Sequence, residues 1–128
     1  MTLMFLTGDG MSGGPLHGEL RGAPLVAVTR TAARYRFWAV GGRFPALEPV
    51  PADGYPVAGE VYDVPLPVLR DHLLPAEPPE LELGIAELDG GAAALAMLLR
   101  RDFTRPGSLA DISATGDWRA YRASHPPP

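Results

Sequence analysis

The chain has 128 residues, enough for one domain whose hydrophobic core needs no disulfide bond. It has no cysteine and only three histidines, far apart in sequence, so thiol chemistry is excluded and neither a metal nor another cofactor is expected. The net charge of −4 argues against nucleic-acid binding, and no apolar run approaches the roughly 20 residues of a membrane span, so we expect a cytoplasmic protein.

The first predicted elements are a buried strand, a glycine-rich loop and a short helix. They occupy residues 2–7 (TLMFLT), 8–15 (GDGMSGGP) and 16–20 (LHGEL). Glycines allow close approach of a ligand to the main chain, and N–H groups beside a helix N-terminus can bind a small anion. The glycines alone favour such a site no more than a plain flexible connection.

Three strands are predicted in the next part of the chain, at residues 22–33, 34–40 and 56–64. The proline-rich stretch 43–54 between the last two is expected to be irregular. Gly59 lies inside the third of these strands, where a glycine marks either a bulge or the close approach of another backbone.

The remainder of the chain is predicted to contain a helix, a hairpin and a final helical turn. The helix covers 65–74 and is ended by the prolines of 75–79. The strands of the hairpin cover 81–88 and 92–99, and a polar connection at 100–107 follows them. The last helix lies in 117–122 and is capped by Thr115 or Asp117. About six strands, mostly in hairpin order, with short helices predict an α+β fold. We expect a small curved, largely antiparallel sheet or barrel in one domain of residues 1–123, and a frayed tail at 124–128.

Several stretches resemble the γ-glutamylcyclotransferase-like superfamily, beginning with FLTGDGM (5–11), which is similar to the loop after its first strand. The closer similarity is to the C-terminal domain of allophanate hydrolases and its small stand-alone relatives. It is carried by MSGGPLH (11–17), TAARYRF (31–37), FPAL (44–47), GEVY (59–62), LGIAELDG (83–90) and GDWRAY (116–121). This resemblance covers nearly the whole chain. It implies a small mixed β-barrel whose first loop binds a small anionic metabolite through backbone N–H groups.

Two loop residues depart from the cyclotransferase pattern. Thr7 stands where those proteins have a tyrosine, and Asp9 stands where they have serine or threonine. A carboxylate at Asp9 would repel a substrate carboxylate unless it points away or is neutralised. Arg34, Arg36 and Arg43 are candidates for that compensation.

The resemblance also implies a catalytic acid/base at Glu77, allowing one residue of offset after the helix. A carboxylate among prolines and leucines can lose part of its hydration, which would raise its pKa toward the range useful for proton transfer. The alternative is that Glu77 only solvates a proline turn.

Other residues near the loop are candidates for substrate binding. With Glu77 as the catalytic residue, the candidate set is Gly8, Asp9, Gly10, Met11, Ser12, His17 and Tyr35. His17 either donates to a bound anion or lies on the helix surface without a role. Tyr35 is interpreted as an aromatic of the core or the cavity wall, and the alternative is that its hydroxyl is available to a ligand. For Glu60, in the middle of a strand, we favour an exposed position.

Two classes of function agree with these features. The first is a small-molecule enzyme acting on an anionic amide or carbamoyl metabolite. It would work either by ring closure to a lactam, with Glu77 moving the proton, or by decarboxylation as the allophanate hydrolase resemblance implies. The second is a non-catalytic module that binds a metabolite or accompanies an amidase. The expected partners are therefore a small anion and either an amidase or a second copy of the chain.

Overall fold

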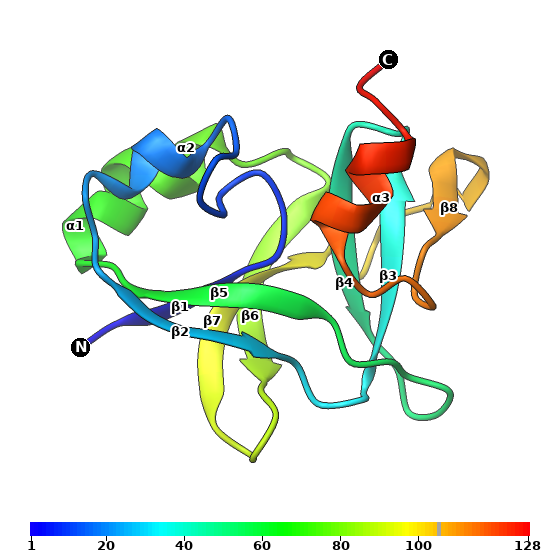
Figure 1. The fold of residues 1–128 in the computed structure, drawn as a ribbon, viewed down its shortest axis with the longest axis horizontal. Coiled ribbons are helices and arrows are strands. Elements are labelled where there is room, and N and C mark those ends of the chain that lie inside the picture. Colours follow the sequence, from blue (N-terminus) through cyan, green and yellow to red (C-terminus); the bar gives the residue numbers. More distant parts are fainter. Residues whose placement is uncertain (105) are drawn as a thin grey trace.

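The computed structural model describes residues 1–104 and 106–128, and these form eight strands and several short helical segments (Figure 1). The strands are β1 (Leu3–Leu6), β2 (Leu25–Arg30), β3 (Tyr35–Val40), β4 (Phe44–Pro49), β5 (Ala58–Asp63), β6 (Leu81–Glu87), β7 (Ala93–Leu99) and β8 (Leu109–Asp111). The helical segments are η1 (His17–Leu20), the contiguous α1 (Leu66–Val68), η2 (Leu69–Leu73) and α2 (Leu74–Ala76), η3 (Pro106–Ser108) and α3 (Trp118–Ser124).

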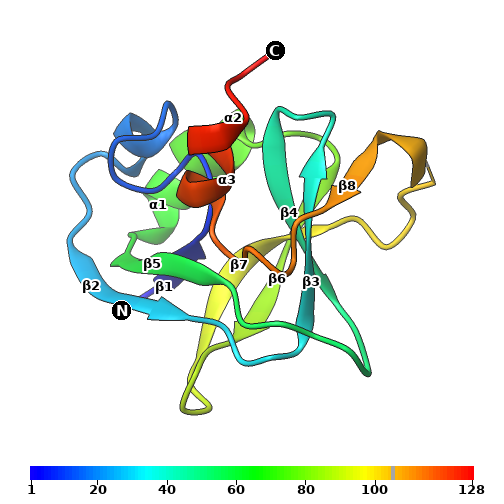
Figure 2. The ribbon, with the colours of Figure 1, turned by 45° about the vertical axis from the view of Figure 1, so that its right-hand side comes forward.

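The strands form one mixed sheet that curls into a half-barrel, as Figures 1 and 2 show. The strand order is β2-β5-β1-β7-β4-β3-β8, and β6 also pairs with β7. The pairs β1–β7 and β4–β7 are parallel, and the other pairs are antiparallel. The predicted α+β fold with a mixed, largely antiparallel sheet is thus confirmed.

Strand β7 organises the sheet because three strands pair with it. β6 pairs along its whole length, so β1 and β4 must share the opposite edge. β1 pairs at Leu95 and Ala96, and β4 pairs only at Leu98. β1 and β4 therefore diverge at this edge, and the glycine loop (residues 8–15) follows β1 beside the gap.

The expectation of an irregular segment at 43–54 was wrong, because β4 lies within it. Pro45 and Pro49 obscured the strand, since proline lacks the N–H group that a central strand normally needs. β4 keeps its antiparallel register with β3 over its whole length, but it meets β7 only at Leu47. A strand so sparsely paired on one edge tolerates missing N–H donors there.

Strand β8 was not predicted, since three residues are too few to show a periodic pattern. It pairs with the outer edge of β3. The expected connection at 100–107 includes residue 105, which lies outside the described residues.

The predicted helix at 65–74 is present but continues through Pro75 to Ala76. Its central turn, η2, is a π-helix that buries Leu69 and Leu73 in the core. Glu77 is the first residue after the helix and has an extended backbone. The helix thus ends just before Glu77, which lines the same pocket as the start of the glycine loop.

Two further local predictions are confirmed. A Cβ atom on Gly59 would lie 2.5 Å from the carbonyl oxygen of Leu6, so this glycine marks a close backbone approach. Asp117 caps α3, because its carboxylate accepts a hydrogen bond from the Ala120 N–H at 3.2 Å. Figure 2 shows α3 next to the glycine loop, although the two are separated by about a hundred residues in sequence.

Candidate functional site

A small pocket lies in the gap between β1 and β4, and we call it the inner pocket. Its volume is about 40 Å³, room for a group of a few heavy atoms. Its walls are residues 5–10, Leu16, Phe44, Pro45, Leu47, Glu77, Pro78, Leu81 and Met97. The fold therefore brings together two features that were predicted separately, the start of the glycine loop and the carboxyl group of Glu77.

The glycine loop is held in shape by its own backbone. The N–H of Met11 donates to the Gly8 carbonyl at 3.1 Å, that of Gly14 to the Met11 carbonyl at 2.9 Å, and that of Leu16 to the Asp9 carbonyl at 2.9 Å. A Cβ atom on Gly14 would collide with the Asp9 carbonyl oxygen. The tight turn therefore requires glycine at this position.

Three amides at the start of the loop, those of Gly8, Asp9 and Gly10, have no acceptor among residues 1–104 and 106–128. All three residues line the inner pocket. Successive N–H groups of this kind can bind an anion or a polarised carbonyl oxygen. The amides of Met11 and Ser12 are bonded within the protein. The Gly13 amide also has no acceptor in the described part of the chain, but Gly13 lines the larger cleft described below and not the inner pocket.

Glu77 is half-buried in the wall of the inner pocket. Burial, followed by the nearby negative charge of Asp9, raises the pKa of Glu77 from 4.5 to about 7. A carboxyl group with this pKa is present in both its acidic and its basic form near neutral pH, as a group that transfers protons requires.

Asp9 is also half-buried, and it lines both the inner pocket and the cleft described next. Burial raises its pKa above 3.8, while the contact with the Trp118 side chain and the positive charge of Arg122 act in the opposite direction with smaller effect. The Asp9 carboxyl group therefore does not point away from the site, and repulsion between Asp9 and Glu77 is part of the electrostatics of the pocket.

A larger cleft lies between the glycine loop and α3, and we call it the outer cleft. Its volume is about 610 Å³. It is lined by Gly8, Asp9, Met11–Pro15, Arg43, Trp118, Arg119, Arg122, Ala123 and Pro127. Of the three arginines suggested by the sequence, only Arg43 lines this cleft; Arg34 and Arg36 form ion pairs with Glu87 and Asp111.

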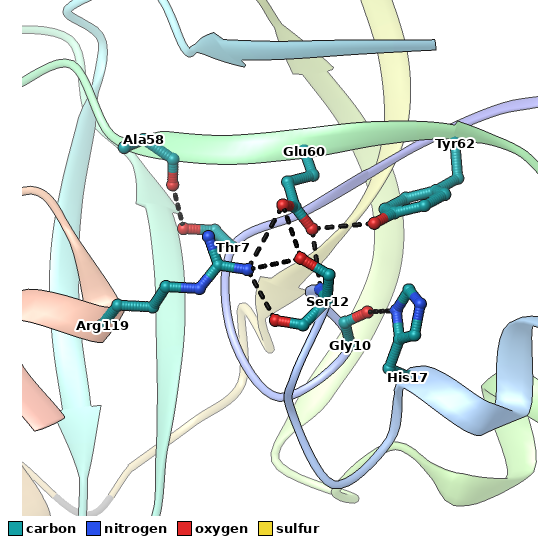
Figure 3. A network of polar contacts seen from close by, with 8 residues as sticks. All are labelled: Thr7, Gly10, Ser12, His17, Ala58, Glu60, Tyr62 and Arg119. Carbon is teal, nitrogen blue, oxygen red and sulfur yellow. Dashed lines mark hydrogen bonds and ion pairs between the residues drawn. The ribbon is translucent and has the colours of Figure 1, made fainter. Parts of the chain in front are cut away.

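A buried carboxylate joins the loop to the sheet, and Figure 3 shows its contacts. Glu60 Oε1 accepts hydrogen bonds from the Ser12 N–H at 2.8 Å and from the Tyr62 hydroxyl at 2.9 Å. Glu60 Oε2 accepts from the Ser12 hydroxyl at 3.0 Å and from Arg119 at 3.2 Å. Arg119 also donates to the Ser12 carbonyl at 2.7 Å. This network fixes the middle of the glycine loop between β5 and α3.

The expected exposure of Glu60 was therefore wrong: only 5% of the residue is exposed. Burial alone would raise the pKa of Glu60, but the hydrogen bonds from Ser12, Tyr62 and Arg119 outweigh that effect and hold the pKa below 4.5. Glu60 is thus an ionised structural group. The alternation of residues in β5 gave no indication of this, because its partners come from distant parts of the chain.

Two of the predicted binding residues lie outside both cavities. His17 Nδ1 donates to the Gly10 carbonyl at 3.0 Å, and its ring meets the Tyr62 ring edge-on. Tyr35 is buried, and its hydroxyl accepts from the Glu87 N–H at 2.8 Å. The structure thus gathers Gly8, Asp9, Gly10 and Glu77 at the inner pocket and places Met11 and Ser12 beside the outer cleft. His17 and Tyr35 support the surrounding structure.

The residues that sequence reasoning missed come from the last helix. Trp118, Arg119 and Arg122 were not among the candidate residues of the sequence analysis. Arg119, Arg122 and Trp118 line the outer cleft together. Arg119 and Trp118 lie in the GDWRAY stretch that carried part of the family resemblance, and this was the available signal.

Within the described residues, no group of three or more His, Asp or Glu side chains is arranged to hold a metal ion. No helix there is both long and apolar enough to cross a membrane.

The curled sheet, the glycine loop after its first strand and the carboxyl group facing that loop define a γ-glutamylcyclotransferase-like fold. The solved structure of an AIG2-like protein from Mus musculus shares it, with a TM-score of 0.61 and 19% identity over 84% of this chain and 82% of that chain. The family model of the allophanate hydrolase C-terminal domain matches residues 2–123, and the chain belongs to this family.

Other solved structures agree with that assignment. The protein c4763, specific to uropathogenic E. coli, is 31% identical over 95% of both chains, with a TM-score of 0.87. Allophanate hydrolase from Kluyveromyces lactis is 23% identical over 96% of this chain, with a TM-score of 0.86, but this chain spans only 21% of that enzyme. Among curated proteins, no significant match was found.

Proposed function

We propose that this protein is a small-molecule enzyme acting on an anionic amide or carbamoyl metabolite, with Glu77 as the group that moves the proton. The observation that carries the proposal is the position of Glu77, a carboxyl group with a pKa of about 7 in the same pocket as the amides of Gly8, Asp9 and Gly10. These amides would hold the oxygen on which negative charge develops. The membership of the allophanate hydrolase C-terminal domain family supports chemistry on an amide or carbamoyl group.

Two reactions fit this arrangement, and they need opposite forms of Glu77. In ring closure, a substrate amine attacks its own amide carbonyl, and the ring C–N bond forms as the original C–N bond breaks. The Glu77 carboxylate takes the proton from the attacking amine and returns it to the leaving amine. In decarboxylation, the N–C bond to a carboxylate breaks and CO₂ leaves. The electron pair stays on nitrogen, which takes its proton from the Glu77 carboxylic acid.

The inner pocket favours the smaller reacting group. A volume of about 40 Å³ suits a group of a few heavy atoms, such as a carboxylate or a carbamoyl group. The direction of the pH dependence separates the two reactions: kcat should rise through about pH 7 for ring closure and fall through about pH 7 for decarboxylation.

The test is turnover of γ-glutamyl amides, β-aminoacyl amides and carboxycarbamate by the wild type and by Glu77→Gln. We expect Glu77→Gln to lower kcat by at least about 100-fold, the usual contribution of a general acid or base. Glu87→Gln, which removes an exposed carboxylate paired with Arg34, is the matched control and should keep full activity.

Equal turnover by wild type and Glu77→Gln would refute the proposed role of Glu77. If the wild type converts none of these compounds and instead co-purifies with an amidase, the protein is an accessory module. This second function is favoured by one observation, that relatives such as the Kluyveromyces enzyme carry the same fold within a chain several times longer.

A further inference from the structure

Arginine side chains gather in the outer cleft although the whole chain is acidic. Three of the eleven arginines, Arg43, Arg119 and Arg122, line it, and the one carboxyl group in its lining is Asp9. The three cations come from the β3–β4 turn and from α3, so the fold rather than local sequence gathers them. This concentration of charge indicates a site for an anion.

Two of these three arginines are already engaged with carboxylates. Arg119 is paired with the buried Glu60 at 3.2 Å, and Arg43 with Glu80 at 3.1 Å. Their charges are therefore largely balanced within the protein.

Arg122 differs, because its partners are neutral. Its guanidinium donates to the carbonyls of Gly42 and Arg43 at 2.8 Å each and of His125 at 3.2 Å. It also lies over the Trp118 ring, with 4.5 Å between Cζ and the ring centroid. Within residues 1–104 and 106–128 no carboxylate forms an ion pair with it.

These contacts fix the orientation of Arg122 without a salt bridge, and the Asp9 carboxyl group, whose charge interacts with that of Arg122, lies farther off than an ion pair. A guanidinium has five N–H donors, and the three carbonyls of the described chain use three of them. An immobilised cation with donors to spare is well suited to bind a carboxylate, since little side-chain entropy is lost on binding.

We propose that the outer cleft binds a carboxylate of the substrate, with Arg122 as the residue that recognises it. This inference rests on the proposed function, and it specifies the substrate class: an amide or carbamoyl compound whose free carboxylate lies several bonds from the reacting group. The reacting group enters the inner pocket beside Glu77, and the rest of the molecule occupies the cleft of about 610 Å³. Asp9 lines both cavities and repels a carboxylate held close to it, so the charge of Arg122 must offset this repulsion for a substrate carboxylate to bind in the cleft.

Binding can be measured without turnover, because Trp118 lines the cleft and the chain has only one other tryptophan, Trp38. The probe is glutarate, titrated into the full chain while the two indole N–H signals are followed by NMR; Trp38→Phe assigns them. Glutaramide, the neutral analogue of the same length, is the matched ligand. We expect glutarate to shift the Trp118 signal and leave that of Trp38 in place, and glutaramide to shift neither.

Substitution then tests the role of Arg122. We expect Arg122→Gln to weaken glutarate binding by about tenfold or more and Arg122→Lys, which keeps the charge, to retain part of it. Arg101→Gln is the control for loss of one positive charge, because the Arg101 side chain is 97% exposed and does not line the cleft. It should leave binding unchanged. An unaltered Trp38 signal verifies that each variant is folded.

Three results would overturn the proposal: no Trp118 shift with glutarate, an equal shift with glutaramide, or an equal loss of affinity in Arg101→Gln and Arg122→Gln. Failure of the proposed function is distinguishable, because Glu77→Gln should bind glutarate like the wild type. If Glu77→Gln also keeps full turnover while Arg122→Gln loses binding, the anion site stands and the role of Glu77 does not.

Discussion

Glu77 combines a reactive position with an energetic cost. Its pKa is about 7 in the folded protein and 4.5 in an unconstrained chain, so the folded state retains a proton that the unfolded state loses between these values. The free energy of unfolding therefore falls as pH rises from 4.5 to 7, and the full cost is present above pH 7. At about 1.4 kcal/mol per pKa unit the cost would reach ~3.5 kcal/mol, and partial exposure reduces it to about 2 kcal/mol.

Replacing Glu77 by Gln removes this cost. We expect Glu77→Gln to be more stable than the wild type by about 2 kcal/mol at pH 8, and the two to differ little at pH 5. Urea unfolding at both pH values, followed by tryptophan fluorescence, measures the difference. A stability increment that is the same at pH 5 and pH 8 would show that Glu77 is not buried as a neutral acid.

At the scale of elements, the glycine loop depends on strand β5 and helix α3 for its shape. Glu60 accepts four hydrogen bonds while almost fully buried, and two of them come from Ser12 in the loop. Truncation of such a group leaves several donors without an acceptor, and each costs free energy.

We therefore expect Glu60→Ala to lower the free energy of unfolding by about 3 kcal/mol, from the lost charge-assisted hydrogen bonds. Glu87→Ala, which removes an exposed partner of Arg34, should cost less than about 1 kcal/mol. Chemical denaturation of the three proteins at pH 7 gives the comparison. Similar small losses in both variants would mean that the Glu60 network does not stabilise the loop.

The elements that could be predicted are those whose pattern is local. The β6–β7 hairpin has a clear alternation and a glycine turn, and the helix before Glu77 begins with proline, so both were found. β4 was missed because its prolines are tolerated only through its sparse pairing with β7, which is a property of the sheet. The role of Glu60 was missed for the same kind of reason, since Ser12 and Arg119 are 48 and 59 residues away in sequence.

The residues of the candidate site also divide into those with a local signal in the sequence and those without one. Gly8, Gly10 and Glu77 were identified from glycine content and from family resemblance, and the structure places them at one pocket. Arg122 was not identified, because an isolated arginine in a terminal helix has no distinguishing pattern. Its proposed role depends on the carbonyls of the β3–β4 turn, which only the folded chain brings to it.

At the scale of the whole molecule, α3 links the two ends of the chain. Trp118 is only 3% exposed, Arg119 bonds the N-terminal loop, and Arg122 bonds the β3–β4 turn. Helix α3 therefore contributes to the candidate site as well as to the core.

Removal of the Trp118 ring should consequently affect global stability. We expect Trp118→Ala to cost about 3–4 kcal/mol, as for other buried aromatic residues. Trp38→Ala, at a half-buried position, should cost less. Thermal unfolding by circular dichroism checks both, and an equal loss would show that Trp118 stabilises the fold no more than a half-buried tryptophan in β3 does.

The edge of β7 that β1 and β4 share has a broader consequence. The inner pocket between β1 and β4 arises from the strand order itself. Both strands pair in parallel with the same edge of β7, so they must separate at some point along that edge. Any sequence that adopts this strand order should therefore have a pocket at the same position, whichever ligand the protein binds. A different activity can then arise when the few side chains around the pocket are replaced, while the hydrogen-bonded sheet that forms the pocket stays unchanged.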